Sequence, residues 1–331
     1  MKKNDTVMRK LLLDCVKKWS NNIRVRFPDS IIFRLVGTDF AEIEMIIGRN
    51  RNNKPSVTAN MQSDASAFEG WALVLKASIV ELKKLTLTWD EPLDKNDKHY
   101  QRFLYRVEKF SVIFQSWFYV GQSYRKALRI KLGSKYKVNV PIKKRDQSYL
   151  KSTADNERKL EQQMINDSVC RQWLKEKVGG SMIGNQLPVG VFDGNVAKGN
   201  AIFTGQASAI DLWGVNEEGD ELSIFELKLP SNKKVGIVSE LFFYSMVMGD
   251  IINGRFSFEG KRCMEVDPWP PDYIRVGKIK KIKAFILTTA THCLINDNVL
   301  KILNDALSPK FVFLRSDPSE CSLHIKNKEA L

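Results

Sequence analysis

The pattern that most restricts how this chain can fold lies in residues 205–230, where two apolar segments are joined by a polar turn. The turn contains Gly219, which adopts positive φ without steric cost, so the flanking segments are expected to pair as a β-hairpin. Centring the hairpin between Glu218 and Gly219 pairs position i with position 437 − i and sets Asp211 opposite Glu226. Two carboxylates that face each other in apolar surroundings repel, and a divalent cation between them removes the repulsion. The pattern therefore predicts a metal-binding pair.

Lys228 follows Glu226 by two residues, which puts both side chains on one face of a strand, about 7 Å apart. The alternate residues Phe225, Leu227 and Leu229 are then expected to face the core. An ammonium beside metal-bound carboxylates can hold and deprotonate a water or stabilise a developing oxyanion, and the Leu227 carbonyl is a further candidate metal ligand. The alternative is a solvated strand edge, which a Glu-x-Lys tripeptide usually marks. The apolar strands and the Asp–Glu register favour a functional site instead.

Hydrophobic periodicity predicts an alternating series of helices and strands between residues 155 and 315. A helix is expected over 155–177, where apolar residues form one stripe and Gly179 and Gly180 stop it. The elements expected after it are strands at 187–191, 201–213 and 222–229, a helix at 235–252, a strand at 284–289, a helix at 299–307 and a strand at 311–314. This order predicts an α/β domain whose mixed sheet is flanked by helices on both sides.

The element order and the placing of Asp211, Glu226 and Lys228 resemble the PD-(D/E)XK nuclease superfamily, which has a restriction-endonuclease-like α-β-β-β-α-β core. The resemblance covers residues 155 to about 315. It implies that Asp211 and Glu226 bind metal and that Lys228 is the catalytic lysine. The family often places another Glu on the first helix, for which Glu161 fits best and Glu157 is the second candidate.

One branch of this superfamily, that of the recombination exonucleases, carries a Gln-x-x-x-Tyr motif on the second helix. The matching segment here runs from Glu240 to Tyr244, with Glu in place of Gln, and Ile210 replaces the proline of the family name. The resemblance implies Mg²⁺ as the cofactor, with Mn²⁺ as a substitute. The implied metal ligands are Glu161, Asp211, Glu226 and the Leu227 carbonyl.

The first half of the chain carries all of the net charge. Residues 1–150 hold 29 Lys and Arg against 15 Asp and Glu, which accounts for the total of +14. The densest basic run lies between residues 125 and 145 and contains no acid. A solvated basic face would explain such a run, but an asymmetry this complete favours a polyanionic partner. The candidate phosphate-binding residues are Lys126, Arg129, Lys131, Lys143, Lys144 and Arg145.

Residues 1–145 are predicted to form a basic α+β domain, 146–154 a linker and 155–331 the nuclease-like domain. Within the first domain, strands are expected at 31–36, 43–47 and 85–89. An amphipathic helix is expected to carry Phe103, Phe110, Phe114 and Trp117 on its apolar face. These aromatics are interpreted as core, with a platform for stacked bases as the alternative.

Other classes of protein fit the sequence less well. No apolar run reaches the ~20 residues that a membrane-spanning helix needs, so no membrane partner is expected. The apolar stretch near the N-terminus is too short for a signal peptide. The five cysteines and three histidines are scattered without a Cys-x-x-Cys pair, which argues against a zinc site and favours reduced thiols in a cytoplasm.

Together these features predict a cytoplasmic, Mg²⁺-dependent nuclease that hydrolyses phosphodiester bonds. DNA is favoured over RNA as the substrate on the family resemblance alone. An endonuclease is favoured over an exonuclease, in restriction, anti-phage defence or DNA repair. Two alternatives belong to other classes: a non-catalytic nucleic-acid-binding module on a nuclease fold, and a structural docking subunit of a larger complex. The sequence leaves open a homo-oligomer or a partner subunit.

Overall fold

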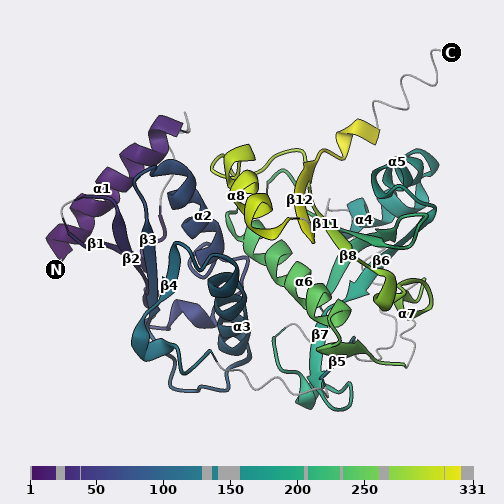
Figure 1. Cartoon of the computed structure of the whole chain (residues 1–331), viewed down its shortest axis with the longest axis horizontal. Coiled ribbons are helices and arrows are strands. Elements are labelled where there is room, and N and C mark those ends of the chain that lie inside the picture. The colour runs from purple at the N-terminus through teal and green to yellow at the C-terminus, as the bar shows by residue number, and fades with distance from the viewer. Residues whose placement is uncertain are drawn as a thin grey trace. The chain divides into compact units, whose positions relative to one another are not determined.

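A computed structural model describes most of the chain (Figure 1). The described residues are 2–19, 27–37, 39–128, 136–140, 157–204, 208–231, 234–260, 268–308 and 310–321. They form two compact units, of which the first comprises residues 1–131, 234–243 and 292–307 and the second comprises 132–233, 244–291 and 308–331. Each unit thus combines segments that are far apart in the sequence, whereas the expected domains follow chain order. The expected linker, 146–154, lies outside the described residues.

The first unit contains a four-stranded sheet in the order β1-β2-β3-β4. Its early elements are α1 (Lys2–Trp19), β1 (Ile31–Leu35), β2 (Glu42–Ile47), η1 (Ser56–Thr58), α2 (Phe68–Ser78), β3 (Lys84–Trp89), α3 (Lys98–Ile113), β4 (Phe118–Val120) and η2 (Gln122–Tyr124). β1 and β2 are antiparallel, and β2–β3 and β3–β4 are parallel. Buried and half-buried residues alternate along β2 and β3, so one face of the sheet is covered.

Aromatic side chains of α3 and the segment after it fill the core of the first unit. Phe103, Phe110 and Phe114 are at most 1% exposed, and Trp117 is 7% exposed. Phe110 makes edge-on contacts with Phe68 and Phe118. The prediction that these aromatics form core is therefore confirmed, and they are not accessible for base stacking.

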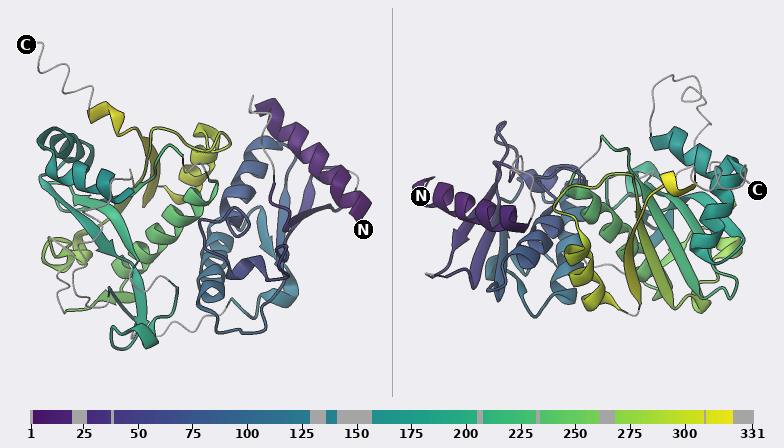
Figure 2. Two further views of the ribbon diagram at one scale, coloured as in Figure 1. Left: turned by 180° about the vertical axis from the view of Figure 1, so that it is seen from behind. Right: turned by 90° about the horizontal axis from the view of Figure 1, so that it is seen from above.

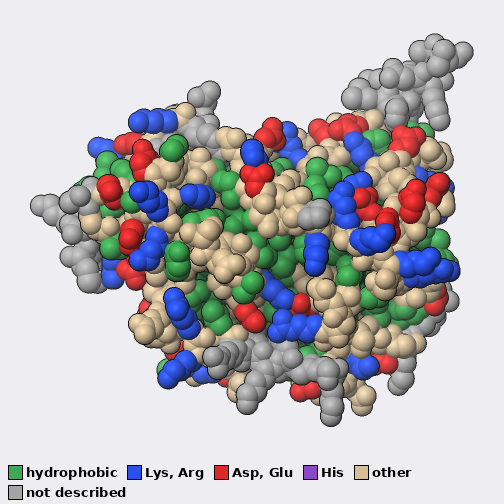
Figure 3. All heavy atoms as spheres, viewed as in Figure 1, with side chains coloured by type: hydrophobic (Ala, Val, Ile, Leu, Met, Phe, Trp, Pro, Cys, Tyr) green, Lys and Arg blue, Asp and Glu red, His purple; other side chains and the backbone are tan. Residues whose placement is uncertain are grey.

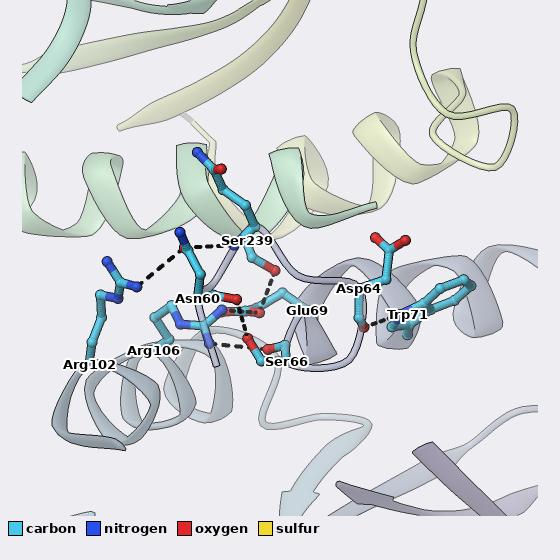
Figure 4. A network of polar contacts seen from close by, with 9 residues as sticks. Asn60, Asp64, Ser66, Glu69, Trp71, Arg102, Arg106 and Ser239 are labelled. Carbon is cyan, nitrogen blue, oxygen red and sulfur yellow. Dashed lines mark hydrogen bonds and ion pairs between the residues drawn. The ribbon is translucent and has the colours of Figure 1, made fainter. Parts of the chain in front are cut away.

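A buried ion pair joins three helical segments of the first unit (Figure 4). Glu69 of α2 accepts hydrogen bonds at Oε2 from Arg106 of α3, at 3.0 Å, and from the hydroxyl of Ser239, at 2.7 Å. Arg106 also donates to the backbone carbonyl of Ser66. Burial raises the pKa of the Glu69 carboxyl, and the Arg106 charge opposes that rise. Ser239 lies in the first turns of α6 (Gly236–Ile252), so this pair ties a distant chain segment into the first unit.

The second unit is built on a five-stranded mixed sheet in the order β12-β11-β9-β8-β6 (Figures 1 and 2). β6 (Met182–Pro188), β8 (Ala209–Val215) and β9 (Glu221–Leu227) form antiparallel pairs. β11 (Lys281–Leu287) and β12 (Phe311–Ser316) continue the sheet in parallel with β9. Parallel neighbours need crossover connections. α6 lies between β9 and β11 in the chain, and α8 (Asp297–Leu307) lies between β11 and β12.

Two helices pack against this sheet through an apolar cluster. They are α4 (Glu157–Asn166) and α5 (Ser168–Val178), and the cluster includes Trp173, Phe225 and Leu227. The smaller elements of the second unit are β5 (Tyr136–Asn139), β7 (Gly190–Asp193), η4 (Lys198–Asn200), β10 (Phe256–Phe258), α7 (Pro270–Tyr273) and η5 (Val276–Lys278). β10, β5 and β7 form a separate three-stranded sheet. The chain is thus mixed α/β, as expected.

The single helix expected over 155–177 is wrong, because Asp167 divides it. The Asp167 side chain accepts hydrogen bonds from the backbone N–H groups of Val169 and Cys170, which caps the start of α5. α5 ends as expected at Gly179, which has φ 72°. The strand expected at 187–191 is also divided, between β6 and β7, and β8 begins at Ala209 rather than Ala201.

None of the helices in the described part of the chain combines the length and the apolar character needed to cross a membrane.

Candidate active site

The hairpin of β8 and β9 has the register that the turn predicts. Leu212 pairs with Phe225 and Val215 with Leu222, and each pair sums to 437. Gly219 in the turn has φ 74°. Asp211 and Glu226 are the next residues beyond the last of these pairs. Asp211 Oδ2 accepts a hydrogen bond of 2.8 Å from the backbone N–H of Leu227, which follows Glu226. The two acids are therefore brought together across adjacent strands.

Lys228 is buried beside these acids, with 3% of its surface exposed. Its Nζ donates to Glu226 Oε1 at 2.5 Å and lies 3.6 Å from Glu157 Oε2. On the other face of the strand, Phe225 and Leu227 are fully buried, as expected. Leu229 is only half-buried, because the strand ends at Leu227. Lys228 thus joins β9 to α4 through two carboxylates.

Two acids of α4 face the site one helical turn apart. Glu157, the second candidate from the sequence, is the one that approaches Lys228. Glu161, the preferred candidate, is 4% exposed and accepts hydrogen bonds from Asn185 Nδ2 at 2.7 Å and from Gln186 Nε2 at 2.8 Å. Burial raises the pKa of the Glu161 carboxyl, while the two amide hydrogen bonds act in the opposite direction. The structure therefore gives the two helix acids different partners.

Asn185 and Gln186 belong to β6 and were not singled out in the sequence. Gln186 has φ 55°, a left-handed conformation that is uncommon for a residue other than glycine. β6 pairs Asn185 with Leu212 and Leu187 with Ile210, so Gln186 lies opposite Asp211. No spacing rule points to an amide donor, and the expected strand began only at residue 187, so these residues could be found only from the folded chain.

The two residues of α6 that match the ends of the Gln-x-x-x-Tyr motif, Glu240 and Tyr244, are both buried. Glu240 is 2% exposed, and its Oε1 accepts a hydrogen bond of 2.6 Å from Gln62 Nε2 of the first unit, to which Glu240 also belongs. Tyr244 is 5% exposed and is assigned to the second unit. Glu240 thus pairs with Gln62, a residue from the N-terminal half of the chain that the sequence did not suggest as a partner. A role for either residue in metal binding stays a prediction.

Of the candidate phosphate-binding residues, the structure describes only Lys126, which is exposed in the turn after η2. Arg129, Lys131, Lys143, Lys144 and Arg145 lie outside the described residues. Several other cations of the first unit are paired with acids, in the ion pairs Arg34–Glu44, Arg49–Asp90, Arg51–Asp29, Lys84–Glu42 and Lys95–Glu91. On the face seen in Figure 3, basic and acidic side chains are interspersed.

The described residues contain no cluster of three or more His, Cys, Asp or Glu side chains in a geometry that could hold a metal ion. The predicted ligands nevertheless suit a hard divalent cation, because Glu161, Asp211 and Glu226 all offer carboxylate oxygens. The Lys228 ammonium already lies 2.5 Å from Glu226 in this structure. Each acid also has a protein donor in this structure, so a metal would have to replace or share those contacts.

Comparisons with known proteins found no matching family model and no significant match among curated proteins or solved structures. The site and the fold are therefore the basis for any functional conclusion.

Proposed function

We propose that the chain is a Mg²⁺-dependent nuclease of the restriction-endonuclease-like class that hydrolyses phosphodiester bonds of DNA. The observation that carries this proposal is the register of β8 and β9, which ends one residue before Asp211 and Glu226, together with the Asp211–Leu227 hydrogen bond and the buried Lys228. The sheet supports it, because three antiparallel strands are followed by α6 and by a strand parallel to the third. With β7, β10 and α7 counted as insertions, this succession supports the α-β-β-β-α-β order that the resemblance implies.

Asp211, Glu226 and Glu161 would hold the metal, and the Leu227 carbonyl is a further candidate ligand. A bound Mg²⁺ would supply Lewis-acid stabilisation of phosphate charge and lower the pKa of a bound water. Lys228 supplies a fixed positive charge within a buried setting, where electrostatic interactions are stronger than in water. Because its ammonium contacts both Glu226 and Glu157, it can position a water or stabilise a leaving oxyanion without reorganising.

The basic region of residues 125–145 is proposed to bind the phosphate backbone of DNA. An endonuclease acting in restriction, anti-phage defence or DNA repair is proposed on the family resemblance. The main alternative is a nucleic-acid-binding module that has the nuclease fold without activity. The buried Lys228 favours the enzyme, since an ammonium shielded from water is costly and a binding module has no need of it.

The test is cleavage by the full chain of supercoiled, linear and single-stranded DNA, and of RNA, with Mg²⁺ or with EDTA. We expect Mg²⁺ or Mn²⁺ to support cleavage of DNA, and Ca²⁺ to permit binding with little cleavage. Asp211→Ala and Glu226→Ala should each abolish cleavage while leaving DNA binding nearly intact. Glu217→Gln is the matched control, because Glu217 lies exposed in the turn of the same hairpin. Full activity in excess EDTA, or in either alanine variant, would refute the assignment.

A further inference from the structure

Two adjacent amides of β6 converge on one buried carboxylate of α4. Asn185 Nδ2 donates to Glu161 Oε1 at 2.7 Å, and Gln186 Nε2 donates to Glu161 Oε2 at 2.8 Å. Glu161 is 4% exposed. Each carboxylate oxygen therefore has its own donor, which fixes both the position and the rotation of the carboxylate.

The backbone at Gln186 is what makes this arrangement possible. Successive residues of a regular strand point to opposite faces, so Asn185 and Gln186 would not both reach one carboxylate. Gln186 has φ 55° instead, and this left-handed conformation brings its side chain to the same acid as that of Asn185. Residues other than glycine adopt it at a cost in free energy, and such strained positions cluster at functional sites.

The position of the strained residue links this pair of amides to the proposed metal site. In the β6–β8 ladder, Gln186 lies between Asn185 and Leu187, whose partners Leu212 and Ile210 flank Asp211. Asp211 in turn accepts a hydrogen bond from the backbone N–H of Leu227, beside Glu226. A purely structural bond between α4 and β6 would need only one polar residue on the face towards α4, with unstrained backbone. Two donors on a strained backbone instead specify the orientation of a single carboxylate.

We infer that Asn185 and Gln186 are positioning residues that hold Glu161 ready as a ligand of a divalent cation. This inference rests on the proposed function, because it assigns the partners of one of its metal ligands. Residues that orient metal ligands typically contribute 10–100-fold to metal affinity.

The test compares Mn²⁺ affinity, by isothermal titration calorimetry of the full chain, with the midpoint of thermal unfolding. Gln186→Gly removes the amide and relieves the backbone, so we expect about tenfold weaker Mn²⁺ binding with a midpoint equal to or above that of the wild type. Asn185→Ala removes the other donor and should weaken binding by a similar factor. Asn53→Gly is the matched control, because Asn53 also has a left-handed φ of 56° but lies in an exposed turn of the first unit.

The control should leave Mn²⁺ affinity unchanged. Wild-type affinity in Gln186→Gly and Asn185→Ala would overturn the inference while the proposed function stands. A Gln186→Gly protein that loses thermal stability together with affinity would also overturn it, in favour of a structural bond between α4 and β6. A wild-type chain that neither binds Mn²⁺ nor cleaves DNA in an EDTA-sensitive reaction would overturn the proposed function, and this inference with it.

Discussion

Among the individual residues of the second unit, Lys228 is the most informative, because its ammonium is buried and has two carboxylates beside it. Burying an ammonium costs several kcal/mol unless opposite charges compensate for the lost hydration. Lys228 is 3% exposed and has Glu226 at 2.5 Å and Glu157 at 3.6 Å. The same contacts compensate for the burial of Glu226, which is also 3% exposed. A change at Lys228 is therefore expected to affect the stability of the fold as well as the proposed activity.

We expect Lys228→Met to abolish cleavage and also to destabilise the fold. The methionine keeps the apolar stem, but it leaves the buried Glu226 without its ammonium, which should cost roughly 3–5 kcal/mol in free energy of unfolding. Lys228→Arg should fail in cleavage too, because a planar guanidinium does not fit the place of a compact ammonium. Urea unfolding and a DNA-cleavage assay measure the two effects.

Lys280→Met is the control for this prediction, since the Lys280 side chain is 80% exposed and pairs with Asp220 at the surface. That variant should keep both its activity and its stability, because exposed ion pairs contribute little. Near-normal cleavage by both Lys228→Met and Lys228→Arg would show that Lys228 has no part in the reaction.

Among the elements, the break between α4 and α5 separates the helix that carries Glu157 and Glu161 from the helix that follows it, and both helices pack on the sheet. Asp167 makes this break by capping α5, and Gly179 ends that helix. On α4, Glu157 is directed towards Lys228, and Glu161 towards the amides of β6. In one continuous helix, α4 and α5 would share a single axis.

Replacing this cap gives a pH-dependent prediction. Hydrogen bonds from the backbone N–H groups of Cys170 and Val169 lower the pKa of Asp167 below its ordinary value of 3.8. Its contribution to stability is therefore complete above that value and is lost as the pH falls through the lower pKa of the folded state. Asp167→Ala should lower the unfolding midpoint by roughly 2–4 °C at neutral pH. Asp167→Asn keeps a capping oxygen and should remain close to the wild type.

Circular dichroism melts between pH 2.5 and 7 would measure the three proteins together. The difference between wild type and Asp167→Asn should change only at the acid end, where Asp167 takes up a proton. An alanine variant that melts with the wild type at neutral pH would show that the cap contributes nothing to the break.

At the scale of the whole molecule, the chain builds its first unit from three separate segments. The start of α6 is part of that unit: a Cβ on Gly236 would lie 2.3 Å from the carbonyl oxygen of Gln62, so only glycine permits this approach. Ser239 and Glu240 add hydrogen bonds to Glu69 and Gln62. A fragment that stops before residue 234 therefore lacks part of its own first unit.

Replacing both Glu69 and Arg106 should lower the free energy of unfolding less than replacing Glu69 alone. Glu69→Leu alone leaves a buried guanidinium without its carboxylate and should cost roughly 3–5 kcal/mol. Adding Arg106→Met removes the remaining charge, and the double variant should recover most of that loss, because burial opposes the ionisation of both groups. Urea unfolding of the two single variants and the double variant tests this. Losses that simply add would contradict it.

The dependence of DNA binding on salt tests whether residues 125–145 bind the phosphate backbone. Each phosphate neutralised on duplex DNA contributes about −0.9 to the slope of log K against log salt. Reversing Lys143, Lys144 and Arg145 to Glu should flatten the slope and weaken binding to all sequences alike, since backbone contacts carry no base information. The full chain must be used, because the first unit includes residues 234–243 and 292–307. An unchanged slope would show that these cations do not contact DNA.

Features that depend only on neighbouring residues could be predicted from the amino-acid sequence. The turn around Gly219 and the apolar segments beside it predicted the hairpin register, and the pairs Leu212–Phe225 and Val215–Leu222 confirm it. Gly179 ended its helix as expected, because a left-handed C-cap is a local property of glycine. Asp167 was missed although its signal is also local, because the apolar stripe continues across it.

The tertiary structure alone decided which groups meet across distant segments. Both Glu157 and Glu161 suit the inner face of a helix, and only the packing of α4 gave one to Lys228 and the other to the amides of β6. The left-handed conformation of Gln186 is stabilised by contacts that its neighbours in sequence do not supply. The inclusion of the start of α6 in the first unit likewise depends on Glu69 and Gln62, more than 150 residues earlier in the chain. Such contacts form only when the whole chain folds, because their free energy depends on surroundings that no local pattern encodes.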